Sequence, residues 1–355
     1  MIKTLLTRTR IQIKRLIGKC VYIYVYIKNS LIAIHKKSKN PQEKNKRKHK
    51  NNLLNYIAVF SEKWRILTLG ALGFLIIYYG LGATVSSTIN NKLDKPIIVT
   101  QKSPRYTTEA LSYVLKSQID DTPWTPALPI IFPAAVLDNL PNFQIGAKDS
   151  AKYIIKRLSS YHTDDNLKEA GELLDYPAHI WLFSQTADDK LAPGSAKQYR
   201  KALAKLTDFA SSENNNKATG SHELLYILSG IENLLERRLN ILNQHVTEHN
   251  SELLDLEADN IFYQTEGYVY TVYYLLKGLS KDYQDIIVET GQYENLTNAM
   301  SFLETASELE PLSIKNASPQ DTYEANHLLY LGYYLSRAQN HLKTIHNHIE
   351  SYARK

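Results

Sequence analysis

The sequence has a single cysteine, Cys20, among its 355 residues. One thiol cannot form an intrachain disulfide, so a disulfide-stabilised fold is excluded, and no Cys-x-x-Cys pair is present. The chain also lacks a phosphate-binding loop, a dinucleotide-binding fingerprint and a GxSxG nucleophile elbow. Nothing in the sequence therefore points to catalysis, and no catalytic residue is predicted.

Acidic residues are scarce at the start of the chain. Residues 1–65 contain 17 Lys and Arg against only Glu43 and Glu62, a net charge of +15. Because the whole chain carries +6, the remaining residues carry −9. A basic head joined to an acidic body is not the charge pattern of a nucleic-acid-binding domain, so no nucleic-acid partner is predicted.

Charge is absent altogether from Ile66 to Asn91, and the apolar part of this run extends from Ile66 to Val85. About 20 helical residues at about 1.5 Å each cross a hydrocarbon core of about 30 Å. Trp64 and Arg65 precede the run, where interfacial aromatic and basic residues belong. The sequence predicts one transmembrane helix over residues 66–88, because a buried core helix is rarely so long and so free of charge.

The flanking charges predict the orientation of this span. Lys and Arg are concentrated before it, which predicts that the N-terminus is in the cytoplasm and that residues 89–355 are on the other side of the membrane. The region ahead of the span is too long for a cleaved signal peptide. We therefore expect a single-pass membrane protein with a basic, partly disordered cytoplasmic extension over residues 1–65.

A second apolar stretch, Cys20–Ile27, is too short to span a bilayer and is bracketed by Lys19 and Lys28. Together with nearby basic residues it predicts that residues 1–35 contact anionic lipid at the membrane surface. A weakly ordered tail is the alternative interpretation.

Beyond the span, apolar residues repeat at helical spacing and no alternating strand pattern stands out. The sequence predicts an all-α antiparallel helical bundle with long Pro-containing loops at Thr122–Pro141 and Tyr176–Pro193. The longest apolar seam lies near the C-terminus and consists of Leu328, Leu331, Leu335, Ala338, Leu342, Ile345 and Ile349.

Three groups of residues, in this order, resemble a known family. They are Leu137–Gly146, Asp259–Gly267, and the pair Ala325–Leu328 and Tyr334–Ala338. The pattern resembles the bacterial inner-membrane family called domain of unknown function twenty-three thirty-three, over roughly residues 66–350. The resemblance implies an inner-membrane protein with one N-terminal span and a helical domain beyond it in the periplasm, but no activity. The family pattern is more acidic where this chain has Asn260 and Gln264, which argues against an acid–base role there.

The family-like segments contain the candidate site residues. We expect the loop 137–146 to dock against the last helix, which predicts either a polar pocket or purely structural contacts. In the structural alternative, Asp and Asn residues cap a helix that starts near Phe143, and Asp259 and Asn260 cap another. The candidate residues are Asp138, Asn139, Pro141, Asn142, Asp259, Phe262, Tyr263, Asn326, His327 and Arg337.

Histidines are the other group with possible ligand chemistry. His245 and His249 have the i, i+4 spacing that can chelate a metal, whereas His327, His341 and His348 are separated by multiples of seven residues. Residues seven apart on a helix are separated by about 10 Å and cannot share one ion. Neither group predicts a metal site, and no cofactor is predicted.

These patterns favour a membrane-anchored, non-enzymatic scaffold or protein-interaction module with an unknown protein partner. The alternative is an envelope hydrolase or small-ligand-binding module that uses a polar pocket near Asp138 and Asn326. A deep pocket lined by these residues and His327 would distinguish the second class from the first.

The charge asymmetry yields a direct test of topology. A reporter enzyme that is active only outside the cytoplasm, fused after Lys355, is expected to be active in cells, because the basic flank retains the N-terminus inside. Activity of a cytoplasm-specific reporter at the same position would reverse the predicted orientation.

Overall fold

The computed structural model describes residues 64, 67–84, 88–100, 103–185, 191–212, 220–250, 255, 257–311 and 313–354. The chain divides into two units, Met1–Gly73 and Phe74–Lys355, and each is described by itself. Apart from Trp64, the predicted basic extension 1–65 and its lipid contact through residues 1–35 lie outside the described residues.

One described helix, Leu67–Thr84, is long and apolar enough to cross a membrane. Its large side chains are mostly exposed, Phe74 and Ile76 each at 65%. A helix in the core of a soluble protein buries such side chains, so this helix differs from the core helices of the same chain.

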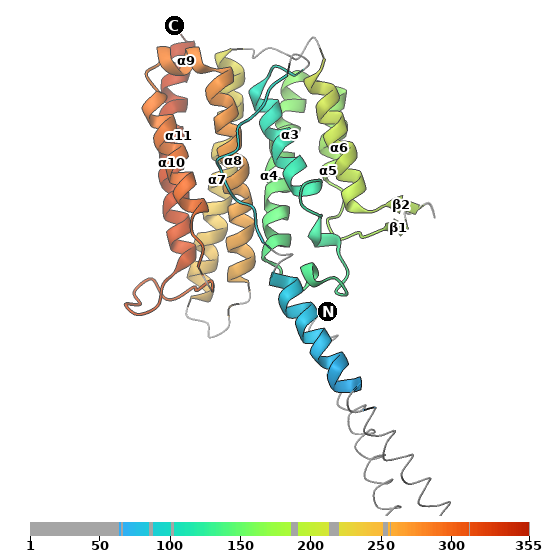
Figure 1. The fold of residues 1–355 in the computed structure, drawn as a ribbon. Helices are drawn as coiled ribbons and strands as arrows, with labels where there is room; N and C mark the ends of the chain where they lie inside the picture. The colour runs from blue at the N-terminus through green and yellow to red at the C-terminus, as the bar shows by residue number, and fades with distance from the viewer. Residues whose placement is uncertain are drawn as a thin grey trace, which may run out of the picture. The chain divides into compact units, whose positions relative to one another are not determined.

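The predicted all-α fold is confirmed. Successive long helices of the second unit run in alternating directions, which makes the bundle antiparallel (Figure 1). The helices are α3 Tyr106–Ile119, α4 Asn139–His162, α5 Asp165–Leu174, α6 Ser195–Ala210, α7 Ser221–His249, α8 Ala258–Asp282, α9 Gln284–Glu289, α10 Tyr293–Ser307 and α11 His327–Ala353.

The apolar seams read from the sequence form the core. Every member of the C-terminal seam from Leu328 to Ile349 is at most 2% exposed on α11, which packs against α10 and α7. The corresponding residues of α4, including Ile154 and Ile155, are fully buried. Helix α8 is the central element, because α3, α4, α7, α10 and α11 all contact it.

The first proline-rich segment is shorter than predicted. It contains two single-turn 3-10 helices, η2 Thr125–Ala127 and η3 Pro133–Ala135, and α4 begins at Asn139 rather than near Phe143. Pro141 therefore lies in the first turn of a helix. Proline is tolerated there because the amide hydrogens of the first turn have no partner inside the helix.

The second proline-containing connection is not only loop. Strand β1 Phe183–Gln185 pairs antiparallel with β2 Leu191–Pro193, with Phe183 opposite Pro193. Three residues per strand are too few to show the alternation that identifies strands in a sequence. The two strands project away from the helices (Figure 1).

Two glycines allow α4 and α8 to approach until their backbones touch. A Cβ on Gly146 would overlap the carbonyl oxygen of Gln264, and one on Gly267 would overlap the carbonyl oxygen of Phe143. Any larger residue at either position would push the two helices apart, so these glycines set the interaxial distance.

The close contact between α4 and α8 predicts that a Gly→Ala substitution is destabilising there and tolerated at a glycine with open space. Gly267→Ala places a methyl group against the backbone of α4, and we expect a loss of about 3 kcal/mol or more in the free energy of unfolding. Gly332→Ala is the matched control on α11, since its Cβ would lie 3.9 Å from the nearest side-chain atom. The control should be neutral or stabilising by up to about 1 kcal/mol, because alanine favours helix.

Denaturant unfolding of the full chain in detergent micelles, followed by circular dichroism, measures both variants. Equal stability of Gly267→Ala and wild type would contradict the close packing of α4 on α8.

Candidate functional site

The first group of predicted residues lies where α4 and α8 begin. Asp138 occupies the N-cap position of α4, but its side chain makes no capping hydrogen bond, so the predicted cap is wrong. Instead, the Asn142 side chain donates to the carbonyl oxygen of Asp138 at 2.9 Å and to the side-chain oxygen of Asn260. These amide contacts join the first turns of the two helices.

Asp259 is likewise not a helix cap. The N-cap of α8 is Glu257, and the amides of Glu257 and Ala258 donate to Asp255 Oδ1 at 3.1 and 3.0 Å. Asp259 accepts from the amide of its neighbour Asn260 at 2.9 Å. Burial, together with the nearby charge of Asp138, raises the pKa of the Asp259 carboxyl.

About one turn further along α8, the predicted residues Phe262 and Tyr263 and the nearby Glu266 have different surroundings. Phe262 is fully buried and belongs to the core. Burial and the charge of Glu266 raise the pKa of Tyr263 to about 12, while Asn139 hydrogen-bonds its side chain. Glu266 is only 2% exposed, and burial, followed by the charge of Glu310, raises its pKa well above the ordinary value. This carboxyl therefore favours its protonated form.

The second group of predicted residues begins α11. Asn326 caps this helix, since its Oδ1 accepts from the amide of Leu329 at 2.9 Å. Its Nδ2 donates to Asn316 Oδ1 at 2.9 Å and to the carbonyl oxygen of Ala317 at 2.6 Å. His327 Nδ1 accepts from the amide of Lys315 at 2.9 Å, and burial lowers the pKa of this histidine.

Asp255, which the sequence analysis missed, links this second group to α7 and α8. Asn316 donates to Asp255 Oδ2 at 3.0 Å, and His245 Nε2 lies 2.8 Å from the same oxygen. Burial alone would raise the pKa of Asp255, but the hydrogen bonds from Asn316 and His245 lower it. The residue precedes α8 in a short connection without a motif, so no sequence signal identifies its partners.

In the described residues, the hydrogen bonds of the predicted site residues form two groups, one at the starts of α4 and α8 and one at the start of α11. Among the described residues, no hydrogen bond joins Asp138, Asn139 or Asn142 to Asn326 or His327. The predicted exchange of hydrogen bonds between the loop and the last helix is not found. Each group instead orders a helix start, which is a structural role.

The paired histidines of α7 are not arranged around a free coordination site. The rings of His245 and His249 stack at 4.8 Å, and Asp255 engages His245 Nε2. Within the described ranges, no group of three or more His, Cys, Asp or Glu residues is placed to hold a metal ion.

Arg337, the last predicted residue, is exposed on α11, and its guanidinium carbon lies 5.2 Å from the ring centre of Phe302 on α10. This distance is within the range of a cation–π interaction, which holds the side chain against the surface. Tyr330 and Tyr333, seven and four residues earlier, are 53% and 56% exposed. The spacing places all three residues on one face of the helix.

A buried ionic cluster lies near the start of α3, outside the predicted residues. Arg105 and Glu223 form an ion pair that is almost fully buried. Tyr283 donates to Glu223 Oε2 at 2.7 Å and accepts from Arg105 at 3.0 Å, and His162 Nε2 lies 2.7 Å from Glu223 Oε1. Burial opposes the charge of Arg105, but Tyr283 and Glu223 raise its pKa above the ordinary value. The cluster joins α3, α4, α7 and the end of α8.

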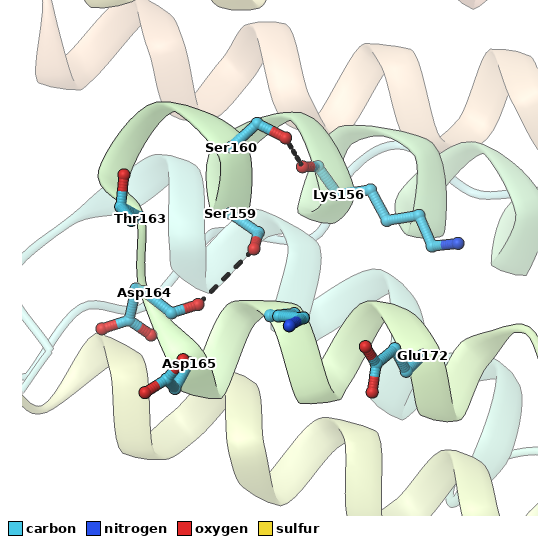
Figure 2. Close-up of a pocket in the computed structure, with 8 residues that line it drawn as sticks. Lys156, Ser159, Ser160, Thr163, Asp164, Asp165 and Glu172 are labelled. Carbon is cyan, nitrogen blue, oxygen red and sulfur yellow. Dashed lines mark hydrogen bonds between the residues drawn. The ribbon is translucent and has the colours of Figure 1, made fainter.

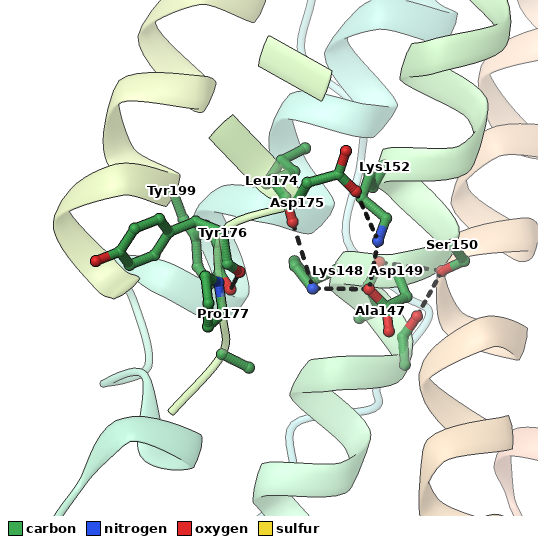
Figure 3. A network of polar contacts seen from close by, with 12 residues as sticks. Ala147, Lys148, Asp149, Ser150, Lys152, Leu174, Asp175, Tyr176, Pro177 and Tyr199 are labelled. Carbon is green, nitrogen blue, oxygen red and sulfur yellow. Dashed lines mark hydrogen bonds and ion pairs between the residues drawn. The ribbon is translucent and has the colours of Figure 1, made fainter. Parts of the chain in front are cut away.

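Figure 3 shows a second network, which joins α4 to the end of α5. Lys148 Nζ lies 2.7 Å from Asp149 Oδ1, and it donates to the carbonyl oxygen of Leu174 at 3.4 Å. Burial lowers the pKa of this lysine. Lys152 continues the network, with Nζ 3.2 Å from Asp149 and 3.3 Å from Asp175. The charged groups of this network are paired with one another.

A cavity of about 490 Å³ opens at the turn between α4 and α5 (Figure 2). Two of its hydroxyls contact the backbone: Ser160 donates to the carbonyl oxygen of Lys156 at 3.1 Å, and Ser159 donates to that of Asp164 at 3.5 Å. Asp164 caps α5 by accepting from the amide of Leu167 at 3.1 Å. The lining contains neither Asp138 nor Asn326, so this is not the predicted pocket.

In comparisons with protein-family models, with curated proteins and with solved structures, no match was found. The family resemblance therefore remains a prediction that rests on the sequence motifs.

The raised pKa of Glu266 predicts a pH dependence of stability. An unfolded glutamate ionises near pH 4.5, whereas the folded carboxyl keeps its proton to higher pH. As pH rises above 4.5, only the unfolded state loses this proton, so the contribution of Glu266 to stability falls until the folded pKa is passed. Gln cannot ionise, and the Glu266→Gln variant should lack this loss.

Thermal unfolding of the full chain in micelles between pH 5 and pH 8 tests the expectation. The gain in melting temperature of Glu266→Gln over wild type should be larger at pH 8 than at pH 5. Glu308→Gln, at an exposed position, is the control and should show no such trend. A gain that is independent of pH would show that Glu266 is ionised in the folded protein.

Proposed function

We propose that the chain is a membrane-anchored scaffold whose periplasmic helical domain binds a protein partner through α11. The binding surface consists of Tyr330, Tyr333 and Arg337 and is called the α11 stripe. The observation that carries the proposal is the exposure of two tyrosines beside an arginine that is ordered on Phe302.

The chemistry of the α11 stripe supports a protein ligand. Tyr and Arg are enriched in protein–protein interfaces, because each offers a large contact area together with hydrogen-bonding groups. Tyr333 also packs edge-on against Tyr334 at 5.4 Å, which restricts its ring before any partner binds. Side chains that are ordered in advance lose less conformational entropy on association.

The anchor and its orientation complete the proposal. The helix Leu67–Thr84 is the membrane span, and the excess of Lys and Arg before it supports a cytoplasmic N-terminus. Resemblance to a single-span inner-membrane family supports the same topology. Under this proposal the acidic remainder of the chain, including α11, is exposed to the periplasm.

The polar groups of the domain support a scaffold more than a hydrolase. Asn326 directs its amide to Asn316 and Ala317, and Asp255 is engaged by Asn316 and His245. These groups order the ends of helices. No observation in the described residues favours the hydrolase or small-ligand alternative.

Site-specific photo-crosslinking in cells tests the α11 stripe. A photoreactive amino acid replaces Tyr333 in the full chain, and an otherwise identical protein carries it at Lys201, an exposed position on α6. We expect a discrete crosslinked product only from position 333, and mass spectrometry of this product identifies the partner.

The specificity control is Arg337→Glu, which reverses the charge beside the crosslinker without disturbing a buried residue. It should weaken or abolish the product, since the stripe would lose its cation and its contact with Phe302. The same products from positions 333 and 201, or none from either, would contradict a partner site on α11.

A further inference from the structure

An exposed apolar surface is formed by the first proline-rich loop and the β1–β2 hairpin. We call it the apolar edge and define it by its exposed side chains. They are Ile130 (75% exposed), Ile131 (58%), Trp181 (43%), Leu182 (58%), Phe183 (60%) and Leu191 (68%). Large aliphatic and aromatic side chains this exposed, and this close together, mark an interaction surface.

The two segments of the apolar edge are held together by specific contacts. The rings of Phe132 and Trp181 meet edge-on with their centres 5.6 Å apart. His179 Nδ1 lies 2.9 Å from the carbonyl oxygen of Pro126, which ties the base of the hairpin to the loop. The apolar edge is therefore one surface built from segments about 50 residues apart in sequence.

The base of the hairpin is fixed to the start of α6. Ser195, which is fully buried, donates its hydroxyl to the carbonyl of Pro177 at 2.6 Å and accepts from the amide of Ile180 at 2.9 Å. The register then places Phe183 opposite Pro193, so Phe183 and Leu191 lie on the same face of the hairpin. The exposed apolar residues are thus presented by an ordered backbone.

The two segments that carry most of the apolar edge contain no formal charge, although Asp188, Asp189 and Lys190 lie in the connection between β1 and β2. No Asp, Glu, Lys or Arg occurs between Thr122 and Leu137 or between Tyr176 and Gln185. The absence of charge removes the penalty for moving these segments out of water into a membrane interface.

Two contacts connect the proline-rich loop with the apolar helix that we propose as the anchor. The hydroxyl of Tyr78 donates to the carbonyl oxygen of Ile131 at 3.1 Å. A Cβ on Gly82 would lie 2.7 Å from Cγ of Pro133, so the missing side chain allows the loop to approach the helix. Residues 130–133 therefore lie beside the last turns of the apolar helix. If this helix spans the membrane, lipid surrounds it there.

From these observations we infer that the apolar edge inserts into the lipid interface as a second, non-spanning membrane contact of the domain. The inference rests on the proposed membrane anchor. Trp181 suits the headgroup boundary, where its ring can remain partly hydrated, and Ile131, Leu182 and Phe183 reach the acyl chains.

The test places a lipid-depth probe on the apolar edge of the full chain in vesicles. Cys20→Ser removes the single natural thiol, and Leu182→Cys is labelled with an environment-sensitive fluorophore. Lys201→Cys on α6 is the matched control. Spin-labelled lipids with the quencher near the headgroup should quench position 182 severalfold more strongly than position 201.

A second set of proteins tests whether the neighbouring apolar residues cause the insertion. The probe is moved to Leu191→Cys and combined with Ile131→Asp and Phe183→Asp. Both substitutions are at exposed positions, and circular dichroism checks that the helical domain is intact. The two introduced aspartates should reduce lipid quenching of the probe at position 191 to the level measured at position 201.

Alkaline extraction of the same vesicles separates failure of this inference from failure of the anchor. If the chain resists extraction and the probe at position 182 is not quenched by lipid, the anchor stands and the apolar edge does not insert. A probe that is shielded from water but not quenched by lipid would indicate docking of a second copy and overturn the inference. If the chain is extracted, the proposed anchor fails, and the lipid contact fails with it.

Discussion

The backbone contact between α4 and α8 is the constraint on which the rest of the bundle depends. Gly146 and Gly267 leave no side chain between the two helices, so each helix lies in van der Waals contact with the backbone of the other. Gly278 allows a similar close contact between α8 and α3, because a Cβ there would lie 2.7 Å from the carbonyl oxygen of Tyr106. Since α7, α10 and α11 also pack on α8, these distances set the positions available to all of them.

Buried charge is the second constraint, and the bundle accommodates it in two ways. Arg105 has a carboxylate partner in Glu223, whereas Arg238, at 4% exposure, is held by the neutral acceptors Gln264 and Thr265 at 3.0–3.1 Å. Burial lowers the pKa of Arg238, and the face of the Tyr268 ring stabilises its charge. Gln264 and Thr265 supply these hydrogen bonds without adding a second buried charge.

Sequence periodicity predicted the all-α fold and the buried seam of α11 because both depend on local spacing along one helix. The polar sites were less predictable, since their partners are far apart in sequence: Arg105 and Glu223 are separated by 118 residues. Asn142 was singled out from sequence, yet its partner Asn260 was interpreted as a helix cap, because Asp and Asn near a helix start usually cap it. Such pairs become visible only once the helices are packed.

The side chains that remain outside these internal networks define what the domain can bind. The six side chains that define the apolar edge are uncharged and apolar, whereas the α11 stripe combines phenol hydroxyls with a guanidinium, so the two surfaces favour different environments. A domain held only by a flexible tether samples many orientations, and a partner must select one of them. A second contact with the bilayer would remove most of that rotational freedom in advance. The α11 stripe would then meet a membrane-bound partner with a smaller loss of entropy on binding.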